Sequence, residues 1–261
     1  RRVLFRSKEG LKIIEDACHA LGSKQVTGNG SIESVGACTL SDFACFSLHP
    51  VKTITMGEGG VTTTKDPDMA RKMATMRSHG MVRDPAKIIN RDLGFDSSGV
   101  ANPWYYEMHE PGFNYRATDF ACALGISQLK KLENFAMRRK ELAALYDRLL
   151  LSLAPLVRPV SRLSPDMAVL HLYAVQIDFT SLGRPRSQVM QWLKDRGIGT
   201  MVHYIPVHYQ PYYVQRYGEL FLPGAETYYS QQLSIPFYPA MTDEDVSRVV
   251  AALTELVQNR A

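Results

Sequence analysis

An acidic and a basic residue each follow a predicted strand. Asp16 closes an apolar run that begins at Leu11, and Lys52 comes shortly after the apolar run 43–48. Because open α/β sheets bind ligands at the carboxyl ends of their strands, the two side chains could share one pocket. A lysine amine can form a Schiff base with a carbonyl compound, whereas an arginine guanidinium stays protonated and is a poor nucleophile. Taken singly, either residue is more often a solvated surface residue.

The stretch after Lys52 predicts the elements that hold this sheet edge. The run Val61 to Thr64 is β-branched and follows a short glycine-rich turn, which favours a strand antiparallel to the preceding one. Asp66 and Pro67 predict the start of a helix to about residue 77. Residues 83–114 are rich in Gly, Pro, Asn and aromatic residues, which indicates a long loop, and long loops in compact domains are often functional.

Helical patterns then predict a connector between two domains. Thr118 caps a helix whose apolar positions continue to Phe135, and a further helical stretch follows. We expect an α/β protein in which residues 1–150 form the large domain, with a mostly parallel sheet and the connector helix, and residues 151–261 form a small C-terminal α/β domain.

The small domain has its own alternation of elements. The patterns predict, in order, a strand over 172–179, a helix over 187–196, a strand over 198–204 and a final helix from Asp243.

Composition excludes several classes of protein. The 261 residues are 45% apolar, and the 30 Lys and Arg residues are not gathered in a basic block, so a nucleic-acid partner is not indicated. No apolar run approaches the roughly 18 residues of a membrane span. The four cysteines lack CxxC spacing, and no secretory segment is visible. We therefore expect no metal site, no disulfide framework and a cytoplasmic location.

Several motifs in fixed order surround Asp16 and Lys52, and together they are far more specific than any one alone. Their order resembles that of the DegT/DnrJ/EryC1/StrS sugar aminotransferases. The segments that resemble this family are residues 15–22, 46–52, 57–60, 77–81, 112–116, 123–129, 171–173, 202–206 and 241–245.

The resemblance implies the pyridoxal 5'-phosphate (PLP) dependent transferase fold type I, which is the aspartate-aminotransferase-like architecture. It also implies a role for five residues. Lys52 would be the catalytic lysine that carries the cofactor, Asp16 would face the pyridine nitrogen, and His19 would lie beside the ring. Ser47 would contact the cofactor phosphate, and Asn114 would reach across a homodimer interface toward the partner's site.

The resemblance also implies a substrate. Met201, Val202, His203 and Tyr204 match a segment that contacts the sugar nucleotide. The most similar branch of the family transfers an amino group from glutamate to a UDP-linked 4-keto-6-deoxy N-acetyl hexose in pseudaminic acid biosynthesis. The family pattern has a polar residue where Met201 stands, which leaves the identity of the sugar open.

Two other hypotheses stay open. The protein could transaminate a different nucleotide keto-sugar; the dehydratases of the same family are less favoured, because they have histidine in place of Lys52. It could also be a non-catalytic, truncated remnant, because family members extend further at the N-terminus. The first residues, Arg1 to Ser7, do not resemble the family, so we expect a fragment with foreign residues in front.

Overall fold

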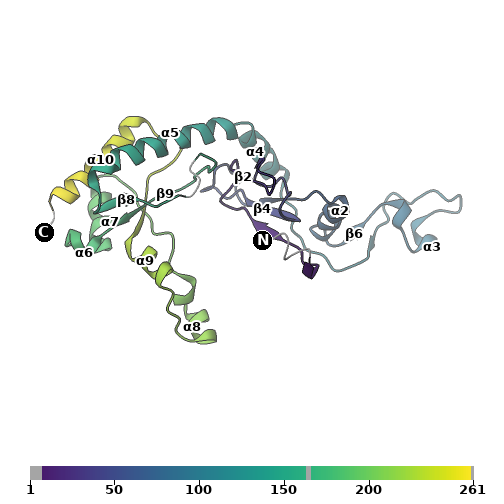
Figure 1. Ribbon diagram of the computed structural model, residues 1–261. Helices are drawn as coiled ribbons and strands as arrows, with labels where there is room; N and C mark the ends of the chain where they lie inside the picture. Colours follow the sequence, from purple (N-terminus) through teal and green to yellow (C-terminus); the bar gives the residue numbers. More distant parts are fainter. Residues whose placement is uncertain (1–7, 163–165, 260–261) are drawn as a thin grey trace. The chain divides into compact units, whose positions relative to one another are not determined.

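The computed structural model describes residues 8–162 and 166–259 (Figure 1). Arg1 to Ser7, expected to be foreign to the family, lie outside the described residues. The chain forms two compact units, unit 1 up to Lys130 and unit 2 from Lys131. The division into domains at residue 150 stays a prediction, because compactness alone does not decide to which domain the intervening helix belongs.

A three-stranded sheet with the order β1-β4-β5 forms the centre of unit 1. Strand β1 (Ile14–Asp16) is parallel to β4 (Phe43–Ser47), and β5 (Gly60–Thr63) is antiparallel to β4 as predicted. Alternate residues of β4, Ala44 and Phe46, are buried in a small core, whereas the residues between them are only partly covered. This period of two is that of a strand with one face on a core.

Other short elements complete unit 1. The helix predicted from Pro67 is confirmed as α2 (Pro67–Met76), whose first turn is capped by Asp66. The stretch between β1 and β4, for which the sequence patterns make no prediction, contains a small antiparallel pair of strands. The remaining elements are β2 (Lys24–Val26), β3 (Ile32–Ser34), β6 (Met81–Val82), η1 (Pro85–Lys87), α3 (Arg91–Gly94), β7 (Glu107–Met108) and α4 (Asp119–Leu129).

The long loop predicted over 83–114 is largely irregular but is organised around one carboxylate. Glu107 accepts hydrogen bonds from the backbone N–H groups of Ile89 (2.8 Å) and Asn90 (2.7 Å). The Tyr105 hydroxyl and the His109 ring contact the same carboxylate at 3.2 and 2.7 Å. These hydrogen bonds, led by the two backbone donors, lower the pKa of Glu107 to about 2.

The helix predicted to continue from Thr118 to Phe135 is interrupted. Helix α4 ends at Leu129, and α5 (Leu132–Leu150) begins after Lys131, whose φ of −100° and ψ of −3° depart from regular helix geometry. Hydrophobic spacing continues across the break, so the pattern alone could not reveal it.

Unit 2 is built on an antiparallel sheet with the order β10-β9-β8. Helices α5 and α10 (Asp243–Gln258) lie side by side (Figure 1). The predicted final helix is confirmed, and five of its apolar residues, Val246, Val249, Val250, Leu253 and Leu256, are buried. The other elements are η2 (Leu151–Leu153), β8 (Val157–Pro159), β9 (Tyr173–Ile177), α6 (Phe179–Leu182), α7 (Arg186–Asp195), η3 (Val207–Tyr209), α8 (Pro211–Tyr217), α9 (Pro223–Gln231) and β10 (Gln232–Ile235).

The prediction of a strand over residues 198–204 is wrong. Only Met201 pairs with the sheet, through a two-way backbone bridge to Ser234 at 3.1 and 2.8 Å. The rest of the 198–204 segment pairs with no strand and is irregular beside β10. The predictions over 172–179 and 187–196 are confirmed as β9 and α7, with boundaries shifted by one or two residues.

Candidate active site

The parallel register of β1 and β4 places the carboxyl ends of both strands at one sheet edge. Asp16, the last residue of β1, is the partner of Cys45, and the next backbone N–H, from Ala17, donates to the Cys45 carbonyl at 2.9 Å. Ser47 ends β4 two residues later. The sheet therefore brings Asp16 and Ser47 to the same edge, as the sequence predicts.

Lys52 lies in a closed loop that joins β4 to β5. Its backbone N–H donates to the His49 carbonyl at 2.9 Å, which forms a tight turn. Leu48 closes the loop by donating to Gly59 (3.0 Å) and accepting from Met56 (2.9 Å). Within the loop, the backbone N–H of His49 donates to the Ser47 hydroxyl at 3.4 Å. The loop thus returns the chain to the sheet and keeps Lys52, which is half-buried, near its carboxyl edge.

Asp16 remains ionised over the whole neutral range. Hydrogen bonding from Cys18, by its thiol and by its backbone N–H at 3.1 Å, lowers the pKa of this carboxyl group. The nearby positive charges of His19 and Lys52 lower the pKa further. In return, the Asp16 carboxylate raises the pKa of the Cys18 thiol. The sequence patterns did not assign a role to Cys18, because a thiol two residues after an acid has no distinctive spacing.

His19 belongs to the same cluster. Partial burial lowers the pKa of its imidazole, and the positive charge of Lys52 lowers it further, whereas Asp16 acts in the opposite direction. The structure therefore brings together Asp16, His19 and Lys52, with Ser47 at the same edge. An ionised carboxylate, an amine and a hydroxyl are the donor set that an aldehyde cofactor with a cationic ring nitrogen and a phosphate requires. The described residues fit such a group.

Asn114 lies elsewhere in unit 1. It pairs with Ser78 in an isolated antiparallel bridge, and its neighbours Phe113 and Tyr115 exchange backbone hydrogen bonds with the segment after α2. The Asn114 side chain is exposed. Among the described residues, no interaction joins Asn114 to Asp16 or Lys52 within one chain, and its expected contact with a partner's site stays a prediction.

The residues predicted to contact substrate are held by β10 in unit 2. The backbone N–H of His203 donates to the Gln232 side chain at 2.9 Å, and its Nδ1 lies 2.8 Å from the Ser234 hydroxyl. Gln232 also donates to Ser234 at 2.8 Å, so the two buried β10 side chains fix the His203 ring. The sequence patterns missed Gln232 and Ser234, because polar residues in an undetected strand carry no visible signal.

The neighbours of His203 differ in exposure. Tyr204 packs edge-on against the His203 ring, with centroids 4.7 Å apart, and is 61% exposed. Met201 is also exposed, and Val202 is half-buried against the core of unit 2. A fixed imidazole beside an exposed phenol can bind hydroxyl or phosphate oxygens.

Neither a metal site nor a membrane-spanning helix is found in the part of the chain that the structure describes. Within residues 8–162 and 166–259, no group of three or more His, Cys, Asp or Glu residues is arranged to hold a metal ion. None of the helices in that same part of the chain is long and apolar enough to cross a membrane.

The chain matches one protein family and is similar to several curated proteins. The model of the DegT/DnrJ/EryC1/StrS aminotransferase family matches residues 5–254. The uncharacterized protein MJ1066 of Methanocaldococcus jannaschii is 38% identical over 253 residues, which make up 96% of this chain and 61% of that protein. The spore coat polysaccharide biosynthesis protein SpsC of Bacillus subtilis is 36% identical over 252 residues, 95% of this chain and 60% of SpsC. The chain thus spans about three fifths of the length of these curated relatives.

Solved structures agree on the fold. Helicobacter pylori PseC, an aminotransferase involved in the biosynthesis of pseudoaminic acid, is 27% identical with a TM-score of 0.80, covering 98% of this chain and 62% of PseC. The aminotransferase TlmJ from Streptoalloteichus hindustanus is 27% identical with a TM-score of 0.77, and the match covers 98% of this chain and 61% of TlmJ. DesI, solved in the presence of its TDP-sugar product, is 26% identical with a TM-score of 0.73, and the match covers 98% of this chain and 58% of DesI. The expected α/β fold of type I PLP-dependent transferases is confirmed.

Proposed function

Since the chain belongs to the DegT/DnrJ/EryC1/StrS aminotransferase family, we propose that the protein is a PLP-dependent aminotransferase that acts on a nucleotide-linked keto-sugar. One observation supports this most directly: Asp16, the last residue of β1, and Lys52, in the loop after β4, lie at one sheet edge, and the charge of Lys52 helps to lower the pKa of Asp16. An ionised carboxylate next to an amine at a strand end is a common arrangement in active sites. The chain covers only part of its relatives' length, so the activity is proposed for the whole protein.

Five residues of this chain would hold the cofactor. The Lys52 amine would bind its aldehyde carbon, the Asp16 carboxylate would hold a proton on its pyridine nitrogen, and His19 would lie beside the ring. Ser47 would donate to its phosphate, and Asn114 would come from the partner chain of a homodimer. PLP, when bound, supplies an aldehyde that accepts the amino group and a ring that stabilises carbanions. Lys52 Nζ would then move a proton between substrate and cofactor carbons.

For the substrate, we propose a UDP-linked 4-keto-6-deoxy N-acetyl hexose with glutamate as amino donor, in pseudaminic acid biosynthesis. The likeness to PseC supports this choice, and the DesI structure with a TDP-sugar product supports a nucleotide sugar more generally. Met201, Val202, His203 and Tyr204 would contact the sugar nucleotide, because β10 fixes the His203 ring beside an exposed phenol. The four free cysteines are consistent with the proposed location in the reducing cytoplasm.

The cofactor assignment is tested by adding PLP to the purified chain and recording its absorption spectrum before and after borohydride treatment. We expect a near-visible band that borohydride converts into a covalent adduct on Lys52. Lys52→Ala should abolish both signals, whereas the matched control Lys24→Ala, an exposed lysine of β2, should keep them. Absence of any Lys52-dependent adduct, in this chain and in a version completed to the length of its relatives, would overturn the proposal and favour a non-catalytic protein.

The substrate assignment needs a separate assay. The completed protein is incubated with glutamate and either the UDP-linked 4-keto-6-deoxy N-acetyl hexose or a TDP-linked keto-sugar, and amino-sugar product is measured by mass spectrometry. Product from the UDP sugar alone supports the proposal. Product from the TDP sugar alone would assign a different nucleotide sugar while leaving the aminotransferase chemistry intact.

A further inference from the structure

One arginine of α5 is buried without a counter-charge. Arg139 is only 5% exposed, and its Nη1 donates to the carbonyls of His171 and Phe237, each at 3.2 Å. Among the described residues, its Nε has no hydrogen-bond partner and no carboxylate forms an ion pair with it. Burial lowers the pKa of Arg139 to about 10, so the guanidinium still carries its charge at neutral pH. The two carbonyl oxygens and the Phe237 ring, whose centroid lies 5.4 Å from the Arg139 Cζ, offset part of this charge. A buried guanidinium without a carboxylate is nevertheless costly, which favours an anionic partner.

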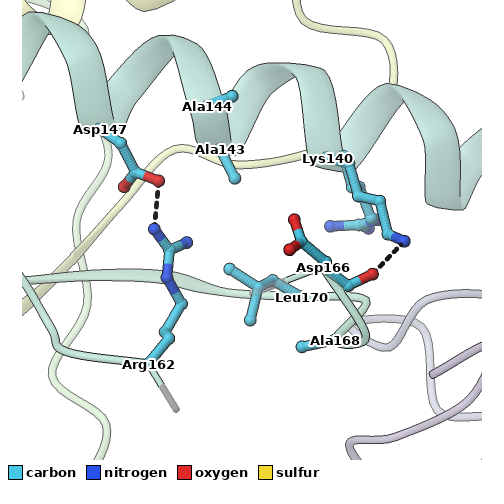
Figure 2. A pocket seen from close by; sticks show the side chains of 9 residues that line it. Lys140, Ala143, Ala144, Asp147, Arg162, Asp166, Ala168 and Leu170 are labelled. Carbon is cyan, nitrogen blue, oxygen red and sulfur yellow. Dashed lines mark hydrogen bonds and ion pairs between the residues drawn. The ribbon is translucent and has the colours of Figure 1, made fainter. Parts of the chain in front are cut away.

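Arg139 lines a cavity of about 340 Å³ that lies wholly within unit 2 (Figure 2). The other two cations at this cavity differ from Arg139, because Arg162 has a carboxylate partner and Lys140 is exposed to solvent. Arg162 forms an ion pair with Asp147, and the Lys140 ammonium donates to the backbone carbonyl of Asp166 at 2.8 Å. Arg139 is therefore the buried cation of this cavity that has no carboxylate partner within the described part of the chain.

An exposed carboxylate also lines this cavity. The Asp166 carboxylate points toward the cavity in Figure 2, and none of the described residues forms an ion pair or a hydrogen bond with it. Arg139 and Asp166 line the same space but do not pair with each other. A ligand with a single negative charge would compensate Arg139, whereas a phosphate dianion would also face the negative charges of Asp166 and Asp147.

From this arrangement we infer that the cavity binds a small zwitterion with one carboxylate and one protonated amine, the chemistry of a free amino acid. Its carboxylate would accept hydrogen bonds from the Arg139 guanidinium, and its ammonium group would contact the Asp166 carboxylate. The cavity is large enough for such a molecule. Its described lining residues include none of Asp16, Ser47 or Lys52, nor the 201–204 segment, so binding here uses none of the residues of the proposed active site.

The test uses the full chain with Lys52→Ala and without PLP, so that binding at the proposed cofactor site does not contribute. L-alanine, propionate and ethylammonium are titrated at constant ionic strength, and binding is measured by calorimetry and by saturation-transfer NMR. We expect L-alanine to bind about tenfold more tightly than either ligand that lacks one of the two charges. Equal binding of L-alanine and propionate would overturn the inference.

Two variants locate the binding. Asp166→Asn changes an exposed side chain and should weaken L-alanine binding about tenfold without weakening propionate binding. Glu133→Gln, an exposed acid of the first turn of α5, is the matched control and should have no effect. Arg139→Met should abolish binding of both carboxylates; if that variant does not fold, Asp166→Asn decides alone. L-alanine binding that is unchanged in Asp166→Asn would place the ligand elsewhere and refute the site.

Discussion

The Asp16 carboxylate accepts a hydrogen bond from the backbone N–H of Cys18, two residues further along the chain, at 3.1 Å. This contact, together with the Cys18 thiol, lowers the carboxyl pKa below its ordinary value of 3.8. A depressed acid pKa contributes stability above the unfolded-state value, and this contribution is lost as the pH falls through the folded-state value. Asp16 therefore does not titrate between about pH 5 and pH 9.

This constant charge gives the first prediction. Asp16→Asn should reduce aminotransferase activity of the completed protein on the order of 100-fold, because the pyridine nitrogen loses the carboxylate that keeps it protonated. Steady-state kinetics with glutamate across the pH range provide the measurement. Asp68→Asn, an exposed acid on α2, is the control. The wild-type activity could instead change in a step near neutral pH, and this step could be missing in Asp16→Asn. That result would contradict the assignment of a low pKa to Asp16.

Glu107 gives a prediction about the loop over residues 84–109. Glu107→Gln should weaken the hydrogen bonds to the backbone of Ile89 and Asn90, because a charged acceptor is replaced by a neutral one. Hydrogen exchange at these two amides should become faster, and Glu110→Gln should leave it unchanged. In the wild type, this protection should be complete above the ordinary glutamate pKa of 4.5 and should decline as the pH falls toward about 2.

Gly60 gives a prediction about stability. A Cβ at this position would lie 2.5 Å from the backbone carbonyl oxygen of Phe46, and this strand backbone has little freedom to move. We expect Gly60→Ala to lower the free energy of unfolding by about 1–3 kcal/mol, as overpacking commonly does. Gly28→Ala, where nothing lies within 4 Å, is the control in urea unfolding. Equal stability of the two variants would show that the β4–β5 contact is looser than described.

Ser234 gives a prediction about substrate binding. Its hydroxyl lies 2.8 Å from both His203 Nδ1 and Gln232 Nε2, so Ser234→Ala would leave two polar groups without this partner. We expect the KM for the nucleotide sugar to rise about tenfold, with the Lys52-dependent PLP band unchanged. Ser247→Ala, on the exposed side of α10, should alter neither. A loss of the PLP band in Ser234→Ala would mean that β10 supports the cofactor site as well.

Local patterns in the sequence were sufficient to predict the parts of the site that depend on strand ends and helix caps. Asp16 and Ser47 lie where the predicted strands end, and Asp66 and Thr118 cap the predicted helices. These features involve residues close together in the chain, so they leave a short-range signal.

The missed features depend on contacts between distant residues. Residues 198–204 have the composition of a strand, but Met201 alone bridges to Ser234 of β10, and this long-range pairing is not visible in the sequence. The hydrophobic spacing across Lys130 and Lys131 likewise gives no sign that one helix ends and another begins. The cavity at Arg139 could not be predicted either, because its lining comes from α5 and from the segment before β9.

The pairing of α5 with α10 has a consequence for how the protein is made. Arg138 near the start of α5 bonds to the Met241 carbonyl and the Asp243 carboxylate, both at 2.8 Å, and Tyr146 donates to the Pro236 carbonyl at 2.9 Å. These partners are separated by about a hundred residues of chain. During synthesis on the ribosome, α5 emerges long before α10 and keeps its apolar face exposed in the meantime. The core of unit 2 is therefore completed only after α10 has been synthesised.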